Sequence, residues 1–146
     1  MKNRIRLLGI AMAAVMAFSM TACIFGDDDD GGHDKGITAL FEDLTPPAPG
    51  SNGKYQITIH GQATHGGWVK FFFDCNNSSY TTGYNFAQGQ DAVTIANNLK
   101  DSINLKFTDG GISGKMNVTS GAGQILIQTT DTAAQYKLTN ATISVE

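Results

Sequence analysis

One stretch of helical periodicity limits most strongly the folds that this chain can adopt. Its apolar residues recur at offsets 0, 3, 4, 7 and 11, in one stripe along the side of a helix: Ala92, Ile95, Ala96, Leu99 and Ile103. Asp91 precedes the stripe and suits the N-cap position. Because an isolated helix of this length is marginal in water, we expect residues 91–104 to cover a β-sheet.

Segments of alternating apolar and polar residues stand on both sides of this helix. Six of them are typical of strands: residues 55–59, 68–73, 80–86, 115–119, 124–130 and 136–145. The last segment changes register near Asn140, which predicts a bulge or break there. Strands, one helix and further strands favour an α+β fold, a mainly antiparallel β-sheet with the helix of residues 91–104 packed on one face.

The N-terminus has the order of a cleaved export signal. Three basic residues stand among the first six, and an apolar run over residues 7–20 follows that is too short to span a bilayer. The residues at its end resemble the lipobox of bacterial lipoproteins, in which small residues precede a cysteine: Met20, Thr21, Ala22 and Cys23. The alternative is an ordinary secretory signal cleaved near Ala22.

The resemblance to bacterial lipoproteins implies that residues 1–22 are removed and that Cys23 then carries lipid, including palmitate. It implies a protein of the cell envelope, anchored to the plasma membrane or the outer membrane with its folded part outside the cytoplasm. With Cys23 lipidated, Cys75 has no cysteine partner and is expected to be a buried thiol. The alternative is a disulfide between Cys23 and Cys75 in an oxidising compartment.

The region after the signal is expected to be a spacer. Residues 23–53 are rich in Gly, Asp and Pro, a composition that favours an extended acidic tether. Within it, four apolar residues at helical spacing predict a possible short helix over residues 37–44: Ile37, Leu40, Phe41 and Leu44. We expect residues 54–146 to form a single globular domain.

The charge of the mature chain restricts its ligands. Counted from Cys23, seven Lys stand against thirteen acidic residues, a formal charge of -6, and there is no Arg. Nucleic acids and anionic lipid headgroups are bound by clustered positive charge, so both are disfavoured as partners. The missing guanidinium groups also disfavour carboxylate and phosphate ligands.

Four residues are the best candidates for catalysis: His60, His65, Asp74 and Cys75. If the strands that carry them are neighbours, they could form a metal site or a thiol nucleophile with a histidine base. Their spacing matches no recognised ligand pattern. A small metal- or thiol-dependent enzyme is therefore the alternative hypothesis, and no metal, cofactor or catalytic residue is assigned.

Four aromatic residues offer a binding surface instead: Trp68, Phe72, Tyr80 and Tyr84. They could line one exposed face, although aromatic residues more often pack in a core. Abundant Asn, Gln, Thr and Ser beside them suit neutral ligands such as sugars or peptide backbones. The leading hypothesis is a non-enzymatic surface lipoprotein with a structural or ligand-binding role. Its partners would be the membrane, through Cys23, and an envelope protein or glycan.

The C-terminal half has a second resemblance. Residues 84–144 contain the segment Gly-Gln-Asp-Ala-Val-Thr-Ile-Ala-Asn-Asn-Leu over 89–99, then a Gly-turned hairpin, then Asp-Thr-Ala-Ala-Gln-Tyr-Lys-Leu-Thr-Asn over 131–140. This order is similar to the strand–helix–hairpin modules of flagellin insertions, hook-associated proteins and phage tail proteins. The resemblance implies a structural or surface-display module without catalysis.

Overall fold

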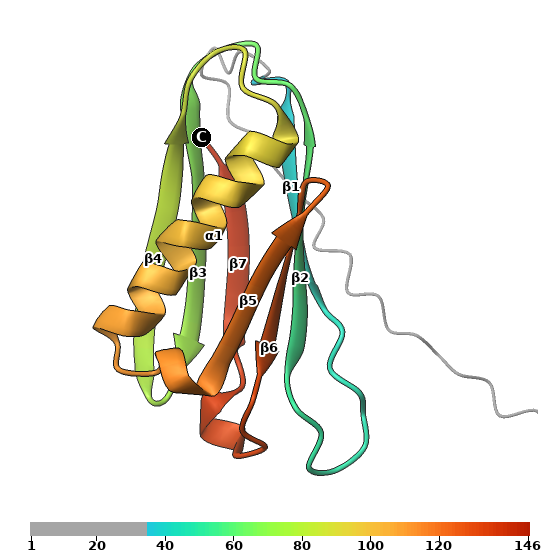
Figure 1. Cartoon of the computed structure of the whole chain (residues 1–146), viewed down its shortest axis with the longest axis vertical. Helices are drawn as coiled ribbons and strands as arrows, with labels where there is room; N and C mark the ends of the chain where they lie inside the picture. The colour runs from blue at the N-terminus through green and yellow to red at the C-terminus, as the bar shows by residue number, and fades with distance from the viewer. Residues whose placement is uncertain (1–34) are drawn as a thin grey trace, which may run out of the picture.

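The computed structural model describes residues 35–146, which form two antiparallel sheets and one long helix (Figure 1). The four-stranded sheet has the order β1 (Ile37–Asp43), β2 (Lys54–Gly61), β6 (Gln124–Thr129), β5 (Met116–Gly121). The three-stranded sheet has the order β4 (Ser78–Phe86), β3 (Gly67–Cys75), β7 (Thr139–Val145). The helix α1 (Ala92–Asp109) and two short 3₁₀ turns, η1 (Ser113–Lys115) and η2 (Ala134–Tyr136), complete the fold. The expected α+β class is confirmed.

The two sheets and the helix close around one core. β1 of the larger sheet contacts β7 of the smaller sheet, so the sheets meet along these two edges. On the other side α1 contacts both β4 and β5, and Figure 1 shows it lying in front, between β4 on the left and β5 on the right. The helix therefore fills the gap that the two sheets leave, rather than covering the face of one continuous sheet.

The core is aromatic along β3. Phe71 and Phe73 are fully buried, and their ring centroids lie 5.0 Å apart. Phe73 also stacks on Tyr80 of β4 at 5.2 Å and meets Phe107 of α1 edge-on at 5.4 Å. Offset and edge-to-face ring pairs add to the free energy of burial, so this row of rings holds β3, β4 and α1 together.

The short helix expected over residues 37–44 is wrong, because this segment is the strand β1. It pairs with β2 along its whole length, from Ile37 opposite Gly61 to Asp43 opposite Tyr55. Over eight residues, the apolar positions fit the two-residue repeat of a strand as well as the 3.6-residue repeat of a helix. Pairing with the edge of β2 stabilises the strand. Residues 37–43 therefore belong to the folded region, which was expected to begin at residue 54.

The helix α1 is longer than expected. Asp91 caps its N-terminus, where its carboxylate accepts a hydrogen bond of 2.8 Å from the Thr94 backbone N–H. It then continues past residue 104, its expected end, to Asp109. The fully buried ring of Phe107 favours the extra turn, and Gly111, with a φ of +69°, follows where the helix ends.

Two further features of the chain bear on the expectations above. The break near Asn140 is confirmed: its φ is +51°, and the β3–β7 register shifts between Phe72 and Asp74. Among residues 35–146, no helix combines the length and apolar character needed to cross a membrane. The signal segment and Cys23 lie outside the described residues.

The end of α1 generates a stability prediction. Replacing Phe107 with Ala removes a fully buried ring and leaves a cavity beside Phe73, so unfolding in urea should become easier by about 3–5 kcal/mol. Leu105→Ala, two residues away, is the matched control because Leu105 is 63% exposed, and it should change stability by no more than about 0.5 kcal/mol. Equal effects of the two substitutions would contradict this account of the helix end.

Candidate functional site

The outer face of the three-stranded sheet is the strongest candidate for a binding surface. Alternation along β3 turns Val69, Phe71 and Phe73 into the core, where all three are fully buried. The same alternation turns Trp68 and Phe72 outward, where they are 45% and 37% exposed. Trp68 and Phe72 thus place two partly exposed aromatic rings on the outer side of the central strand of this sheet.

The residues opposite Trp68 and Phe72 on the neighbouring strands are uncharged, except for Glu146, which lies beside Trp68 and exchanges two backbone hydrogen bonds with it. On β4, Asn85 lies opposite Trp68, Thr81 lies opposite Phe72, and Gly83 lies opposite Lys70 between them. On β7, Thr142 and Ser144 lie opposite Phe72 and Lys70, respectively. At the centre of the face, Gly83 leaves the β4 side without a side chain.

Both ionised groups of β3 on this face are engaged by neighbours. Lys70 forms an ion pair with the carboxylate of Glu146. The Asp74 carboxylate accepts hydrogen bonds from the Asn140 amide at 2.7 Å and from the Ser79 hydroxyl at 2.6 Å, and these two bonds lower its pKa. The face therefore presents one ion pair and one ionised, hydrogen-bonded carboxylate beside neutral polar groups and two aromatic rings.

Tyr80 and Tyr84 do not belong to this surface, so the expected four-residue aromatic face is corrected. They lie opposite Phe73 and Val69 in the ladder and share the inner side of the sheet with them. Tyr80 stacks on Phe73, and the Tyr84 hydroxyl lies 3.0 Å from the Gln90 side-chain nitrogen, which donates to it. Both rings are partly buried against the core.

The four candidate catalytic residues are not brought together. His60 is near the end of β2 and His65 is in the loop before β3, whereas Asp74 and Cys75 end β3. The length of β3 separates the two pairs by about 25 Å. Among residues 35–146, no group of three or more His, Cys, Asp or Glu side chains could hold a metal ion.

The environment of Cys75 is that of a structural thiol. Its side chain is buried and donates weakly to the backbone carbonyls of Gln135 at 3.7 Å and Tyr136 at 3.4 Å. Burial raises its pKa from 9.0 to about 11. A nucleophilic cysteine has a lowered pKa, so Cys75 is not activated for attack. Its proposed disulfide partner, Cys23, lies outside the described residues.

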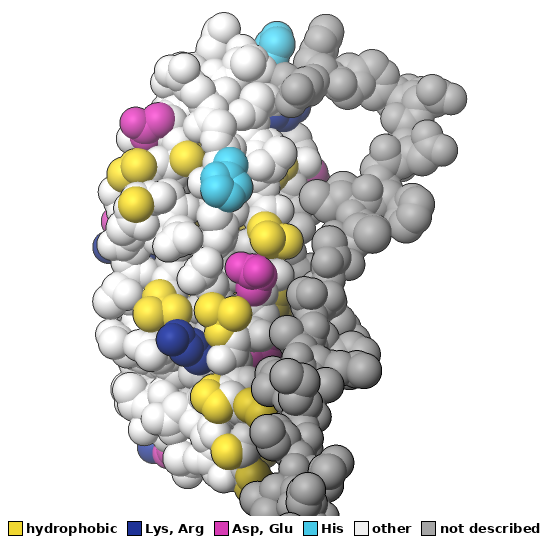
Figure 2. Space-filling view, turned by 90° about the vertical axis from the view of Figure 1, so that its right-hand side faces the viewer, with side chains coloured by type: hydrophobic (Ala, Val, Ile, Leu, Met, Phe, Trp, Pro, Cys, Tyr) yellow, Lys and Arg dark blue, Asp and Glu magenta, His cyan; other side chains and the backbone are white. Residues whose placement is uncertain are grey.

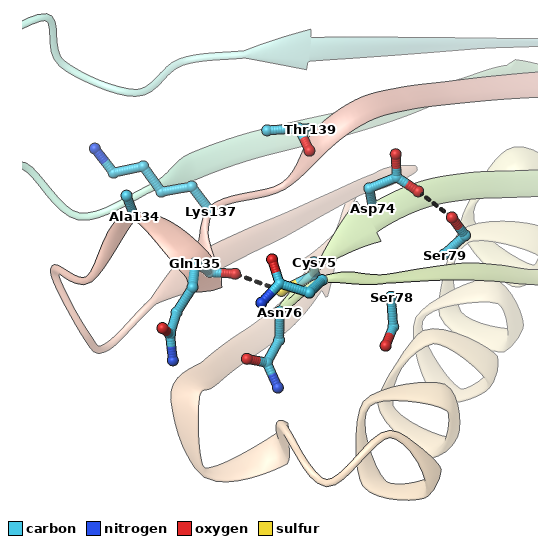
Figure 3. Close-up of a pocket in the computed structure, with 10 residues that line it drawn as sticks. Asp74, Cys75, Asn76, Ser78, Ser79, Ala134, Gln135, Lys137 and Thr139 are labelled. Carbon is cyan, nitrogen blue, oxygen red and sulfur yellow. Dashed lines mark hydrogen bonds between the residues drawn. The ribbon is translucent and has the colours of Figure 1, made fainter.

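A hollow of about 320 Å³ opens beside Cys75, at the end of β3 and β4 (Figure 3). Asn76 and Asn77, with φ of +51° and +59°, form the tight turn between these strands. Figure 3 shows the Asp74 carboxylate directed toward Ser79 and the Gln135 carbonyl against the end of β3. Of the side chains that line this hollow, those of Asp74, Ser79 and Cys75 form hydrogen bonds within the protein.

The outer face of the four-stranded sheet has a different character. Two open hollows of about 320 and 580 Å³ share Lys54 and are otherwise lined by Asn, Gln, Thr, Ser and a few apolar residues. Figure 2 views the side that carries β1 and β2 and shows apolar side chains in separate patches on a mostly polar surface. No aromatic side chain lines either hollow, so neither offers a ring on which a ligand can stack.

Comparisons with protein-family models, with curated proteins and with solved structures find no match to this chain. The candidate site is therefore assigned from its own geometry.

Cys75 gives a reactivity prediction. A pKa of about 11 in place of 9.0 leaves about 100-fold less thiolate at pH 8. In a Cys23→Ser chain, whose one remaining thiol is Cys75, reaction with Ellman's reagent should be at least that much slower than for free cysteine and should rise with pH toward 11. The same chain unfolded in guanidinium should react at the ordinary rate. Fast reaction of the folded protein at pH 8 would restore the thiol-enzyme hypothesis.

Proposed function

We propose that this protein is a non-enzymatic surface lipoprotein whose folded part is a ligand-binding module. Its lipid would be attached to Cys23 and would hold it at the plasma membrane or the outer membrane. The ligand would bind the outer face of the three-stranded sheet. The outward rings of Trp68 and Phe72 are the observation that carries the binding role, because the core uses the other side of β3.

The position of β1 in the fold is compatible with a lipid on Cys23. Residues 24–36 separate Cys23 from β1, and such a segment can span up to about 45 Å when extended. β1 begins opposite Gly61, at the end of the sheets farthest from the Asn76–Asn77 turn. The Trp68–Phe72 face runs along the side of the folded region, so a tether at one end leaves it open to large ligands.

A non-catalytic role is favoured by the separation of the reactive groups. His60 lies near the end of β2 and His65 in the loop before β3, whereas Asp74 and Cys75 lie at the far end of β3, and the Cys75 thiol has a raised pKa. Catalysis by acid–base or nucleophilic groups requires those groups within hydrogen-bond reach of one another. The exposed aromatic face, by contrast, needs no rearrangement to bind.

The lipid anchor is tested by substituting the cysteine. Cys23→Ser should abolish incorporation of an alkyne-tagged fatty acid and release the protein from the membrane fraction. Cys75→Ser is the matched control, since the hydroxyl can donate to the same two carbonyls, and it should be labelled like the wild type. If the wild-type protein takes up no fatty acid, the ordinary secretory signal cleaved near Ala22 is the correct interpretation.

The binding face is tested with the full chain in detergent and a cell-envelope fraction of the producing cells. The double variant Trp68→Ala/Phe72→Ala should co-sediment with that fraction about 30-fold less tightly, as expected for two truncated aromatic anchors. Leu105→Ala, an exposed residue of α1, should bind like the wild type. Trp68 is the one Trp of the chain, so a shift of its emission on binding reports contact at the site itself. Unchanged binding of the double variant would exclude this face.

A further inference from the structure

The spacing of Trp68 and Phe72 suits an elongated ligand. Four residues apart on one side of β3, their Cα atoms are about 13 Å apart. Between them Lys70 is held by Glu146, and the neighbouring positions on β4 and β7 are Gly83 and Ser144. A ligand that touches both rings must therefore run along β3 and pass over Lys70 and its ion pair with Glu146.

The charges of the face favour a neutral ligand. Lys70 is paired with Glu146, and the Asp74 carboxylate already accepts two hydrogen bonds. An anionic polymer would have to displace Glu146 from Lys70, and the mature chain offers no Arg to replace it. A cationic ligand would have to compete with Lys70 for the Glu146 carboxylate, and with Asn140 and Ser79 for the Asp74 carboxylate. An uncharged ligand leaves these bonds in place.

The size of the face disfavours a protein partner. Three strands about 4.8 Å apart, of nine, nine and seven residues, give a face of at most about 14 by 30 Å, or about 400 Å². A stable protein interface buries about 800 Å² on each partner, around a core of closely packed anchors. Two partly exposed rings on a face of half that area are better matched to a narrow chain molecule.

We infer that the ligand is a neutral glycan chain that lies along β3 and stacks on both Trp68 and Phe72. The C–H face of a sugar ring is apolar and packs on the electron-rich face of an aromatic ring. Its hydroxyl groups then reach the uncharged polar side chains at the borders of the face: Thr81, Asn85, Thr142 and Ser144. This inference rests on the proposed function and specifies its ligand.

The experiment separates glycan from protein within the same envelope fraction. One portion is boiled in detergent and digested with protease, which strips protein and lipid and leaves polysaccharide. The wild-type full chain should bind this portion as well as the untreated one, in 50 mM and in 500 mM NaCl alike, because a neutral ligand gives no salt dependence. Oligosaccharides released from it by mild acid and passed through an anion exchanger serve as competitors.

The length of the competing oligosaccharide tests whether one ligand bridges the two rings. Neutral hexasaccharides from this pool should compete about tenfold better than disaccharides, because only the longer chain can reach both Trp68 and Phe72. Phe72→Ala should reduce this ratio to about twofold while Trp68 emission still responds. Phe72→Tyr, which keeps a ring, should restore the ratio, and equal urea midpoints for the two variants exclude a folding defect.

Three results would overturn the glycan assignment. Loss of binding after protease, with no competition by oligosaccharides, would identify a protein ligand. Competition by the anionic pool alone, with binding weakened by salt, would identify a charged polymer. Equal competition by disaccharides and hexasaccharides would show that one ligand does not bridge Trp68 and Phe72. In all three cases binding to the untreated fraction persists, so the proposed function stands; if the wild type fails to bind the untreated fraction, the proposed function itself fails.

Discussion

The packing of α1 between β4 and β5 is the contact on which the rest of the structure depends. Its stripe of Ile95, Leu99, Ile103 and Phe107 is fully or almost fully buried, and each such side chain contributes about 1.5–3 kcal/mol of transfer free energy. Without the helix, β4 and β5 would both be open edges, where unpaired backbone groups invite association with other chains. The helix therefore does two things at once: it supplies one wall of the core, and it determines which side of each sheet faces inward.

That choice of inner side is what exposes the candidate site. Once Phe71 and Phe73 of β3 pack against α1 and the larger sheet, period-two alternation forces Trp68 and Phe72 to the outside. The core is complete without these two rings, and smaller polar residues at the same positions would suit water better. The assignment rests on these two rings rather than on the hollow beside Cys75, because that hollow offers no aromatic ring on which a ligand can stack.

The sequence predicted the secondary structure of segments whose apolar residues fit a single period. It did not predict the structure of segments for which contacts with neighbouring strands decide between helix and strand. The stripe from Ala92 to Ile103 is long enough to exclude a strand, so the helix and the α+β class were predictable. Residues 37–44 are too few to distinguish the two periods, and only the edge of β2 makes them a strand. The aromatic face depended on one turn: with Asn76 and Asn77 as a two-residue loop, Phe73 pairs with Tyr80 and Phe72 with Thr81, which sends the tyrosines inward. The expected strands 68–73 and 80–86 leave six residues between them, which hid that register. The alternation over residues 136–145 predicted a strand, but its pairing with β3, across a helix and a hairpin, had no local signal.

A face of this size implies weak binding by each protein molecule. The proposed lipid anchor would compensate by holding many molecules in one membrane. About 400 Å² with two stacking rings offers few contacts to offset the ordering of a flexible polymer. Copies held in one membrane by lipid, however, meet successive segments of the same chain at high effective concentration, so modest individual affinities combine into firm attachment. By the same logic, the proposed binding would gain specificity and strength from repetition of a neutral motif rather than from strong ionic contacts. The proposed lipid on Cys23 and the rings on β3 would then depend on each other, because neither alone would give firm attachment to a polymer.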